Sequence, residues 1–175
     1  MTLKLISPSE SHEQAWKNIL AEFKAHGEKL PHGLHLKLNT DEYGVYLAKV
    51  RDSEKGINLP EGFPPKSEYF LIEETSSEII GHVTIRHFLN EYLLNVDGHI
   101  GFSIGPSKRE KGYGTKQLRL ALNICRQMGL EKVMLACNSD NFASAAVIKN
   151  NGGVFENVFT ENDGTIIERY WIHLE

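Results

Sequence analysis

The chain has 175 residues, of which 41% are hydrophobic and 24% charged, so it can bury the core of one globular domain spanning residues 1–175. Its formal net charge of −4 argues against non-specific binding to nucleic acid, which usually requires a basic face. The N-terminus lacks the apolar core of a signal peptide, and no stretch approaches the roughly 20 apolar residues of a membrane span. We therefore expect a cytoplasmic protein with no nucleic-acid or membrane partner.

The first predicted elements are a strand and two helices. Residues 3–6 favour a short strand, and a capping-box spacing at Ser11 begins a helix that is expected to reach about Gly27. The apolar face of this helix consists of Trp16, Ile19, Leu20 and Phe23. A second helix is capped by Asn39 or Thr40. Its apolar face consists of Tyr43, Tyr46, Leu47 and Val50, for which core packing is one interpretation.

A loop and a hairpin follow in the middle of the chain. Glycines and prolines forbid a continuous helix or strand from residue 51 to residue 67, so this segment is either a lid or a passive connection. Residues 69–73 and 79–89 are then predicted to form an antiparallel hairpin. Its longer strand leads toward the next predicted strand, which begins near Gly98.

The stretch from Gly98 to Gly114 combines a strand, a glycine-rich turn and the start of a helix. The strand breaks at Gly105-Pro106, and three cations, Lys108, Arg109 and Lys111, precede Gly112-Tyr113-Gly114. The helix that follows has Leu118, Ala121, Leu122, Cys125 and Met128 on one face. The first N–H groups of a helix have no internal partner, the helix dipole adds positive potential, and glycine lets a phosphate approach the backbone. We therefore expect an anion to bind at this turn.

The glycine spacing excludes the two commonest phosphate loops. No G-x-x-x-x-G-K-[ST] P-loop is present, and the third glycine of a Rossmann G-x-G-x-x-G fingerprint is missing. The sequence instead reads R-x-x-G-x-G at Arg109, Gly112 and Gly114. An I-x-P step at Ile104 and Pro106 lies just upstream. This arrangement resembles the signature loop of the GCN5-related N-acetyltransferase (GNAT) family, which binds the pyrophosphate of acetyl-CoA.

The resemblance continues after this helix. Residues 132–137 are an almost unbroken apolar run, as in a strand covered on both faces. The positions that match the family's second cofactor motif are Asn141, Ser144 and Gly152. Two positions depart from it, because Ile148 stands where the family usually has tyrosine and Gly153 replaces a phenylalanine. That tyrosine is proposed in many members to protonate the leaving thiolate, so the role is unfilled here or passes to a group such as Ser144.

A final hairpin is predicted from residues 154–159 and 166–174, joined by a loop containing Asp163-Gly164. The fold class is therefore α/β, with a mixed, mostly antiparallel sheet of six to seven strands flanked by about four helices. The resemblance covers roughly residue 79 to the C-terminus. It implies a GNAT-like sheet that is splayed at the cofactor cleft, with a β-bulge between Ser103 and Pro106 helping to open the gap.

The resemblance also implies how acetyl-CoA is held. Its pantetheine arm would pair with the free strand edge, and the backbone N–H of Ile104 would hold the thioester carbonyl and later the oxyanion. The expected cofactor-binding residues are Ile104, Arg109, Lys111, Gly112, Tyr113, Gly114, Thr115, Asn141 and Ser144.

The implied reaction is direct attack of an amine on the thioester, without a covalent enzyme intermediate. A lysine-like ammonium has a pKa of about 10.4, so a base must remove a proton at neutral pH. Asp97, His99 and Glu73 are candidates, directly or through a water, and His99 has the most suitable intrinsic pKa. In the family, the segment between the first two strands contributes the acceptor pocket, so Tyr43 and Tyr46 are candidate substrate contacts as well as candidate core residues.

These observations predict an acetyl-CoA-dependent N-acetyltransferase that acts on a primary amine of a small molecule or a protein. The missing tyrosine keeps an alternative open, namely an acyl-CoA-binding sensor or regulatory module with little or no turnover. A different acyl group, such as succinyl or propionyl, is also left open. So is a homodimer, since dimers are common among similar proteins.

No metal site is expected. Cys125 and Cys137 form neither a C-x-x-C pair nor a zinc spacing, so we expect both to be buried and reduced. His32 and His35 have no cysteine or carboxylate ligand nearby, which favours a solvated or substrate-lining role.

Overall fold

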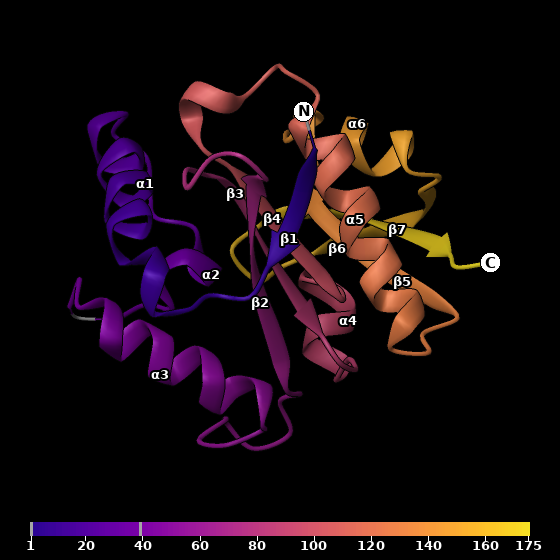
Figure 1. Cartoon of the computed structure of the whole chain (residues 1–175). Helices are drawn as coiled ribbons and strands as arrows, with labels where there is room; N and C mark the ends of the chain where they lie inside the picture. The colour runs from indigo at the N-terminus through magenta and orange to yellow at the C-terminus, as the bar shows by residue number, and fades with distance from the viewer. Residues whose placement is uncertain (1, 39) are drawn as a thin grey trace.

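The computed structural model describes residues 2–38 and 40–175. Two antiparallel sheets lie at its centre, one of four strands in the order β1-β2-β3-β4 and one of three in the order β5-β7-β6 (Figure 1). The strands are β1 Leu3–Ile6, β2 Lys66–Glu73, β3 Ile79–Arg86, β4 Ile100–Ile104, β5 Lys132–Asn138, β6 Val154–Thr160 and β7 Ile166–His173. The mixed α/β architecture and the number of strands expected from the sequence are confirmed.

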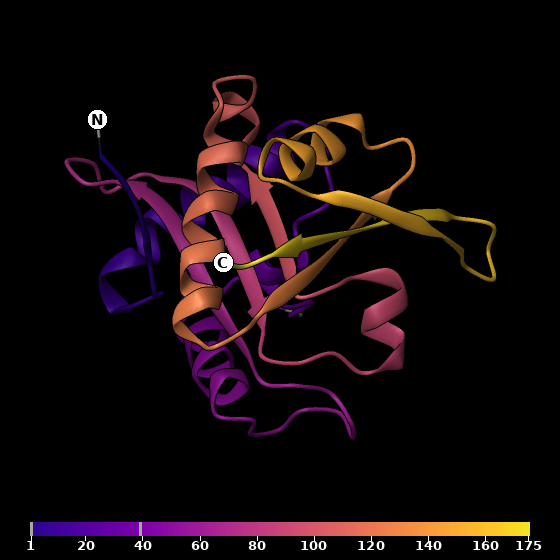
Figure 2. The same cartoon turned by 90° about the vertical axis from the view of Figure 1, so that its right-hand side faces the viewer.

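Helices cover both faces of the four-stranded sheet (Figures 1 and 2). One face carries α1 Glu13–Ala25, α2 His32–His35 and α3 Tyr43–Glu54. The opposite face carries α5 Tyr113–Gln127, which also contacts α6 Phe142–Asn150. The short helix α4 Glu91–Val96 precedes β4 and contacts β5 and β7. None of the helices in residues 2–38 and 40–175 is long and apolar enough to span a membrane.

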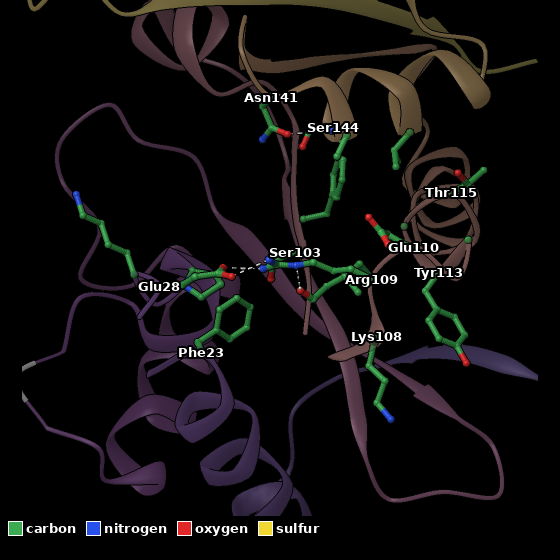
Figure 3. Close-up of a pocket in the computed structure, with 18 residues that line it drawn as sticks. Phe23, Glu28, Ser103, Lys108, Arg109, Glu110, Tyr113, Thr115, Asn141 and Ser144 are labelled. Carbon is green, nitrogen blue, oxygen red and sulfur yellow. Dashed lines mark hydrogen bonds and ion pairs between the residues drawn. The ribbon is translucent and has the colours of Figure 1, made fainter. Parts of the chain in front are cut away.

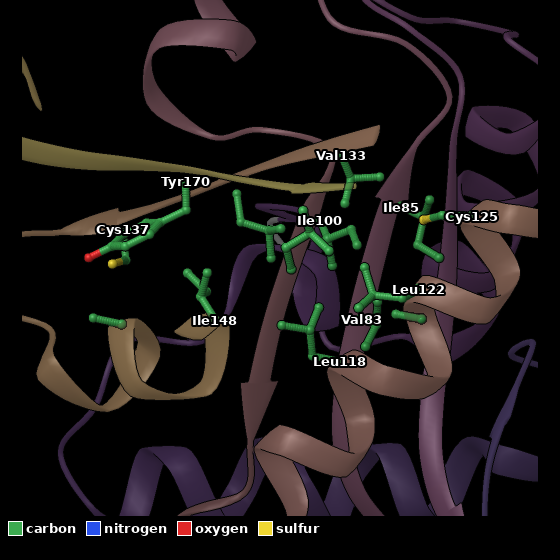
Figure 4. Packing of buried hydrophobic residues seen from close by; sticks show 14 residues of the cluster. Val83, Ile85, Ile100, Leu118, Leu122, Cys125, Val133, Cys137, Ile148 and Tyr170 are labelled. Atoms are coloured by element: carbon green, nitrogen blue, oxygen red, sulfur yellow. The ribbon is translucent and has the colours of Figure 1, made fainter. Parts of the chain in front are cut away.

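Each face of the four-stranded sheet has its own hydrophobic core. Under α1 and α3 the core is aromatic, and the indole Nε1 of Trp16 donates to the Leu34 carbonyl oxygen at 2.6 Å. The core under α5 continues to α6 and the second sheet, where Figure 4 shows Ile148 and Tyr170 in the same cluster as Leu118. The two cores are separate, and no residue of α1–α3 belongs to the hydrophobic cluster beneath α5.

The two cysteines lie in the second of these cores. Both are free, and both are buried, as the sequence predicts. Burial raises the pKa of the Cys125 thiol to about 12 and that of the Cys137 thiol to about 11. Both therefore remain protonated at neutral pH, which makes them packing residues rather than nucleophiles.

Several helix boundaries differ from the predicted ones. The capping box begins at Ser9 instead of Ser11, with the Ser9 N–H donating to His12 Nδ1 at 3.0 Å. Helix α3 has Glu42 as its N-cap, and Thr40 accepts a bond from the Glu42 N–H at 3.1 Å without capping the helix. Asn39, the other expected cap, lies outside the described residues. The predicted face of α5 is buried except at Met128, which follows the helix and is 38% exposed.

The two sheets meet at one end of β4 and β5 and separate beyond it. Gly98 and Leu135 form an isolated bridge, beside which the His99 N–H donates to the Met134 carbonyl oxygen at 2.7 Å. Among the described strands, β4 is then bonded only to β3 and β5 only to β7. The splayed sheet expected from the sequence is therefore confirmed.

The predicted bulge between Ser103 and Pro106 is wrong. Strand β4 pairs with β3 in unbroken register from Ile100 to Ile104, and Gly105 continues the ladder by donating to the Ile80 carbonyl oxygen at 2.9 Å. The strands instead diverge from a tight contact at Gly98, where an added Cβ would lie 2.3 Å from the Met134 carbonyl oxygen. Contact at this one point lets the other ends of β4 and β5 stand apart.

Candidate active site

A cleft of about 660 Å³ opens where β4 and β5 separate (Figure 3). Its walls are the loop from β4 to α5, the start of α6, and the end of α1 with the segment that follows it. The residues predicted to bind the cofactor that line this cleft are Ile104, Arg109, Gly112, Tyr113, Gly114, Thr115, Asn141 and Ser144. The fold thus brings eight of the nine predicted cofactor residues to one place.

The loop before α5 and the first turn of the helix line this cleft. Gly112 is the N-cap of α5 and has a left-handed backbone with φ 75°, which favours glycine. Since glycine has no side chain, it cannot cap the helix, and an added Cβ there would meet no atom within 4 Å. The positive end of the helix and the amides of Gly114 and Thr115 therefore face space that suits an anion.

Gly114 has a role that the sequence did not indicate. A Cβ at this position would lie 3.0 Å from Cγ2 of Val147 on α6, which is a tight contact. The absence of a side chain thus lets α5 and α6 approach each other. Gly112 faces the cleft, whereas Gly114 sets the distance between the two helices that form its walls.

The free edge of β4 faces the split. The Arg86 N–H donates to the His99 carbonyl oxygen, and Gly105 donates to Ile80, so the odd-numbered residues of this segment bond to β3. Bonding alternates along an antiparallel strand, and the main-chain groups of Phe102 and Ile104 therefore point away from β3. This is the orientation that the predicted role of the Ile104 N–H requires.

Arg109 reaches across the cleft to the wall formed after α1 (Figure 3). Its Nη1 and Nη2 each lie 2.7 Å from a carboxylate oxygen of Glu28, and its Nε donates to the Ile104 carbonyl oxygen at 3.3 Å. The hydrogen bonds from Arg109 hold the pKa of Glu28 below its ordinary value. Glu28, which the sequence did not single out, is therefore an ionised carboxylate in the cleft.

The start of α6 forms the upper wall of the cleft in Figure 3. The Asn141 side chain caps the helix by accepting from the Ser144 N–H at 3.1 Å, and both residues line the cleft. Ile148, which replaces the tyrosine usual in the family, is fully buried in the core and has no access to the cleft. The side chain that stands in the tyrosine position is therefore a packing residue.

The neighbouring lysines are engaged elsewhere. Lys108 lines the cleft, but its Nζ lies 2.8 Å from Oε2 of Glu78. Lys111 does not line the cleft, and its Nζ donates to the Ser107 carbonyl oxygen at 2.9 Å. Of the nine expected cofactor residues, Lys111 is the one that the structure leaves outside the site.

His99 is not placed to act as a base. Its Nδ1 accepts the Met134 N–H at 2.9 Å, and the side chain lies at the closed end of the split, where it joins β4 to β5. Desolvation lowers the pKa of His99 to about 4. The ring is therefore neutral at pH 7, and the nitrogen that would take a proton is already occupied.

Asp97 also lies away from the cleft. It lines a second cavity of about 1030 Å³ at the other end of the sheet, together with Lys66 and Arg86. Its carboxylate accepts from Nη2 of Arg86 at 3.0 Å. Glu73, the third candidate base, is the last residue of β2, pairs with Leu3 and lines neither cavity. The three predicted bases are therefore separated from the predicted cofactor residues.

Tyr43 and Tyr46 lie in the core under α1 and α3, so the substrate-contact interpretation is wrong. They are 3% and 0% exposed and pack on Trp16. The Tyr43 hydroxyl donates to the Ser9 carbonyl oxygen at 2.8 Å, and the Tyr46 hydroxyl to that of Gly33 at 3.1 Å. The helical spacing indicated a buried face correctly, but it carried no information about the acceptor.

A family model described as an acetyltransferase (GNAT) domain matches residues 5–154. The chain belongs to the GNAT acetyltransferase family. No curated protein matches the sequence significantly. The family match agrees with the glycine-containing loop before α5 and with the split sheet, the two features that the resemblance led us to expect of a GNAT chain.

Solved GNAT structures share the fold at low sequence identity. RimJ of Mycobacterium smegmatis in complex with CoA-disulfide is 18% identical, with a TM-score of 0.72 over 98% of this chain and 81% of that one. Ribosomal-protein-S5-alanine acetyltransferase from Vibrio fischeri is also 18% identical, with a TM-score of 0.70 over 99% and 92%. The microcin C7 self-immunity acetyltransferase MccE, solved with acetyl-CoA and AMP, is 15% identical, with a TM-score of 0.67 over 98% and 92%.

Proposed function

We propose that this GNAT chain transfers the acetyl group of acetyl-CoA to a primary amine of a small molecule or a protein, by direct attack on the thioester. The observation that carries the proposal is the free edge of β4, which faces a split beside a helix start without a side-chain cap. One feature suits an extended pantetheine arm and the other suits a diphosphate. The solved neighbours with CoA and acetyl-CoA support this choice of donor.

The described residues fit the donor. The amides of Gly114 and Thr115 would bind the diphosphate, and the absence of a Cβ at Gly112 leaves room for it. The outward-facing edge at Phe102 and Ile104 would bond the pantetheine amides. When bound, acetyl-CoA supplies the activated acetyl thioester. The Ile104 N–H would then stabilise the negative charge that develops on the carbonyl oxygen during attack.

Ser144 is the group that we propose to protonate the leaving thiolate. It lines the cleft from the first turn of α6, whereas the side chain at position 148 is buried. The hydroxyl can pass its proton to sulfur as the carbon–sulfur bond breaks and take up a proton that the attacking amine loses, so that no alkoxide is left behind. Replacement by alanine is expected to lower kcat several-fold without changing the dissociation constant for CoA by more than about twofold.

Thiol release with acetyl-CoA and a panel of amines tests the proposal. The panel contains alkylamines, polyamines and peptides with free α-amino groups, because the solved neighbours are described as acting on either small molecules or ribosomal proteins. We expect amine-dependent release of one thiol per acetylated product, identified by mass. Tight CoA binding without thiol release from any acceptor or thioester would instead favour the sensor alternative.

A further inference from the structure

The guanidinium of Arg109 lies among three groups that attract a cation. Glu28 offers two carboxylate oxygens at 2.7 Å, and Ile104 offers its carbonyl oxygen at 3.3 Å. The guanidinium carbon also lies 5.8 Å from the centroid of the Phe23 ring. Carboxylates, carbonyl oxygens and aromatic faces all bind positive charge. Phe23, Glu28 and the Ile104 carbonyl, here called the cation pocket, come from the end of α1, the segment after it and the end of β4.

The cation pocket lies where an acceptor amine is needed. All its residues line the cleft, and Ile104 contributes both the pocket's carbonyl oxygen and the N–H proposed above to hold the thioester. A primary ammonium has three N–H donors, which matches the three oxygens that the pocket presents. The Arg109 guanidinium thus fills a pocket whose groups also suit the ammonium group of a primary amine.

Arg109 can exchange its partner for a phosphate. Its side chain is 44% exposed and that of Glu28 is 37% exposed, so the ion pair is screened by water. An exposed ion pair contributes little to stability, whereas a diphosphate offers guanidinium a bidentate partner with more than one negative charge. Donor binding in the same cleft therefore competes with Glu28 for Arg109.

We propose that the cation pocket binds the ammonium group of the acceptor, and that Arg109 blocks it until the diphosphate of the donor draws the guanidinium away. This inference rests on the proposed function and adds to it the group that recognises the amine. Once Arg109 leaves, the ammonium takes over the hydrogen bonds that Arg109 gave to Glu28 and to the Ile104 carbonyl oxygen, so one cation replaces another in the pocket.

The first experiment measures CoA binding calorimetrically in the wild type and in Glu28→Gln. If Glu28 competes with the donor for Arg109, the variant binds CoA about threefold more tightly. The matched control is Asp41→Asn, which also removes one carboxylate charge from an ion pair, here with Lys24, but does not line the cleft. Its affinity for CoA should equal that of the wild type. Weaker CoA binding in Glu28→Gln would show that Glu28 holds Arg109 in place for the donor, and would overturn the inference.

The second experiment follows the binding of n-butylammonium by NMR titration without any donor. We expect weak binding to the wild type, at least about tenfold tighter binding to Arg109→Ala, and loss of that gain in Arg109→Ala/Glu28→Gln. Addition of CoA to the wild type should produce a similar gain. Arg109→Gln replaces Arg109→Ala if the alanine variant does not fold, as judged by thermal unfolding. Equal affinity of the wild type and the position-109 variants for butylammonium would overturn the inference.

These two experiments separate failure of the inference from failure of the proposed function. If CoA does not bind the wild type, the donor assignment fails, and the titration of Arg109→Ala still tests the cation pocket by itself. If CoA binds but removal of Arg109 gains no affinity for butylammonium, the cation pocket is wrong and the donor site stands. A steady-state readout supports the pocket if Glu28→Gln raises the KM for the amine more than tenfold.

Discussion

The two sides of the cleft offer different kinds of contact to the ligands proposed for them. The side formed by Gly112, Gly114 and Thr115 uses main-chain amides and a helix dipole, and its shape depends on glycines that lie close together in sequence. The opposite side, formed by Phe23 and Glu28, uses side chains brought there by the packing of α1. A site made of main-chain amides can be recognised from a short sequence pattern. A site made of side chains from distant segments cannot, because it depends on the whole fold.

The largest expected effect is the loss of CoA affinity when a negative charge is added to the side of the cleft formed by main-chain amides. Gly112→Asp places a carboxylate at the N-cap of α5, where aspartate caps well and tolerates a left-handed backbone, so the fold should survive. Repulsion of the diphosphate at about 4 Å costs about 4 kcal/mol at an effective dielectric constant of about 20. The dissociation constant for CoA should therefore rise about 1,000-fold in calorimetry.

The matched variant for this prediction is Gly112→Asn, which has the same shape and backbone tolerance but no charge. It should weaken CoA binding only about tenfold. Gly129→Asp controls for backbone strain, because Gly129 has φ 80°, meets no atom within 4 Å of an added Cβ and follows the far end of α5. Equal CoA affinities for the aspartate and asparagine variants at position 112 would place the diphosphate elsewhere.

His99 joins β4 to β5 at the closed end of the split, and its titration tests that junction. The folded pKa of about 4 lies below the ordinary value of 6.5, so the unfolded chain binds more protons between these pH values. Stability therefore falls as the pH falls, and His99 should account for about 2 kcal/mol of the loss between pH 7 and pH 5. His99→Asn keeps an acceptor for the Met134 N–H and should lose less stability over this interval.

Urea unfolding of the wild type and His99→Asn at pH 7 and pH 5 measures this difference directly. His12, His32 and His87 also have pKa values lowered by burial, but all three are present in each protein and cancel in the comparison. Identical losses of stability in the two proteins would mean that His99 is protonated in the folded state, and so does not accept the Met134 N–H.

The smallest effect on stability and KM is expected from substitution of Tyr43 and Tyr46, which are buried in the core under α1 and α3. Tyr46→Phe removes the hydrogen bond to the Gly33 carbonyl oxygen and should lower the free energy of unfolding by about 1 kcal/mol in urea. The KM for the amine should stay within about twofold, because the phenol is buried. Tyr43→Phe, which loses a bond to Ser9, serves as the parallel case. A several-fold rise in KM at unchanged stability would return these residues to the acceptor site.

The sequence predicts the local backbone features of the molecule better than the side-chain contacts that depend on the whole fold. The strands, the long helices and the glycine-rich turn before α5 follow from periodicity and from glycines with a backbone role. Helices α2 and α4 were not predicted, because four and six residues are too few to establish a helical period.

The pairing of Arg109 with Glu28 was also beyond prediction, since 81 positions separate the two residues. The choice of His99 as a base rested on its intrinsic pKa. Its burial and its bond to Met134 decide otherwise, and neither is visible in the sequence. Chemistry inferred from residue type alone was therefore least accurate where tertiary packing sets protonation.

The separate hydrophobic clusters on the two faces of the four-stranded sheet have a consequence for how such an enzyme diversifies. Substitutions that repack α1–α3 can therefore reshape the proposed acceptor wall at Phe23 and Glu28 without disturbing the hydrophobic cluster beneath α5. Transplanting residues 7–65 from another family member should therefore leave the core beneath α5 intact, and a chimera that keeps Glu28 should also keep the donor affinity of this chain.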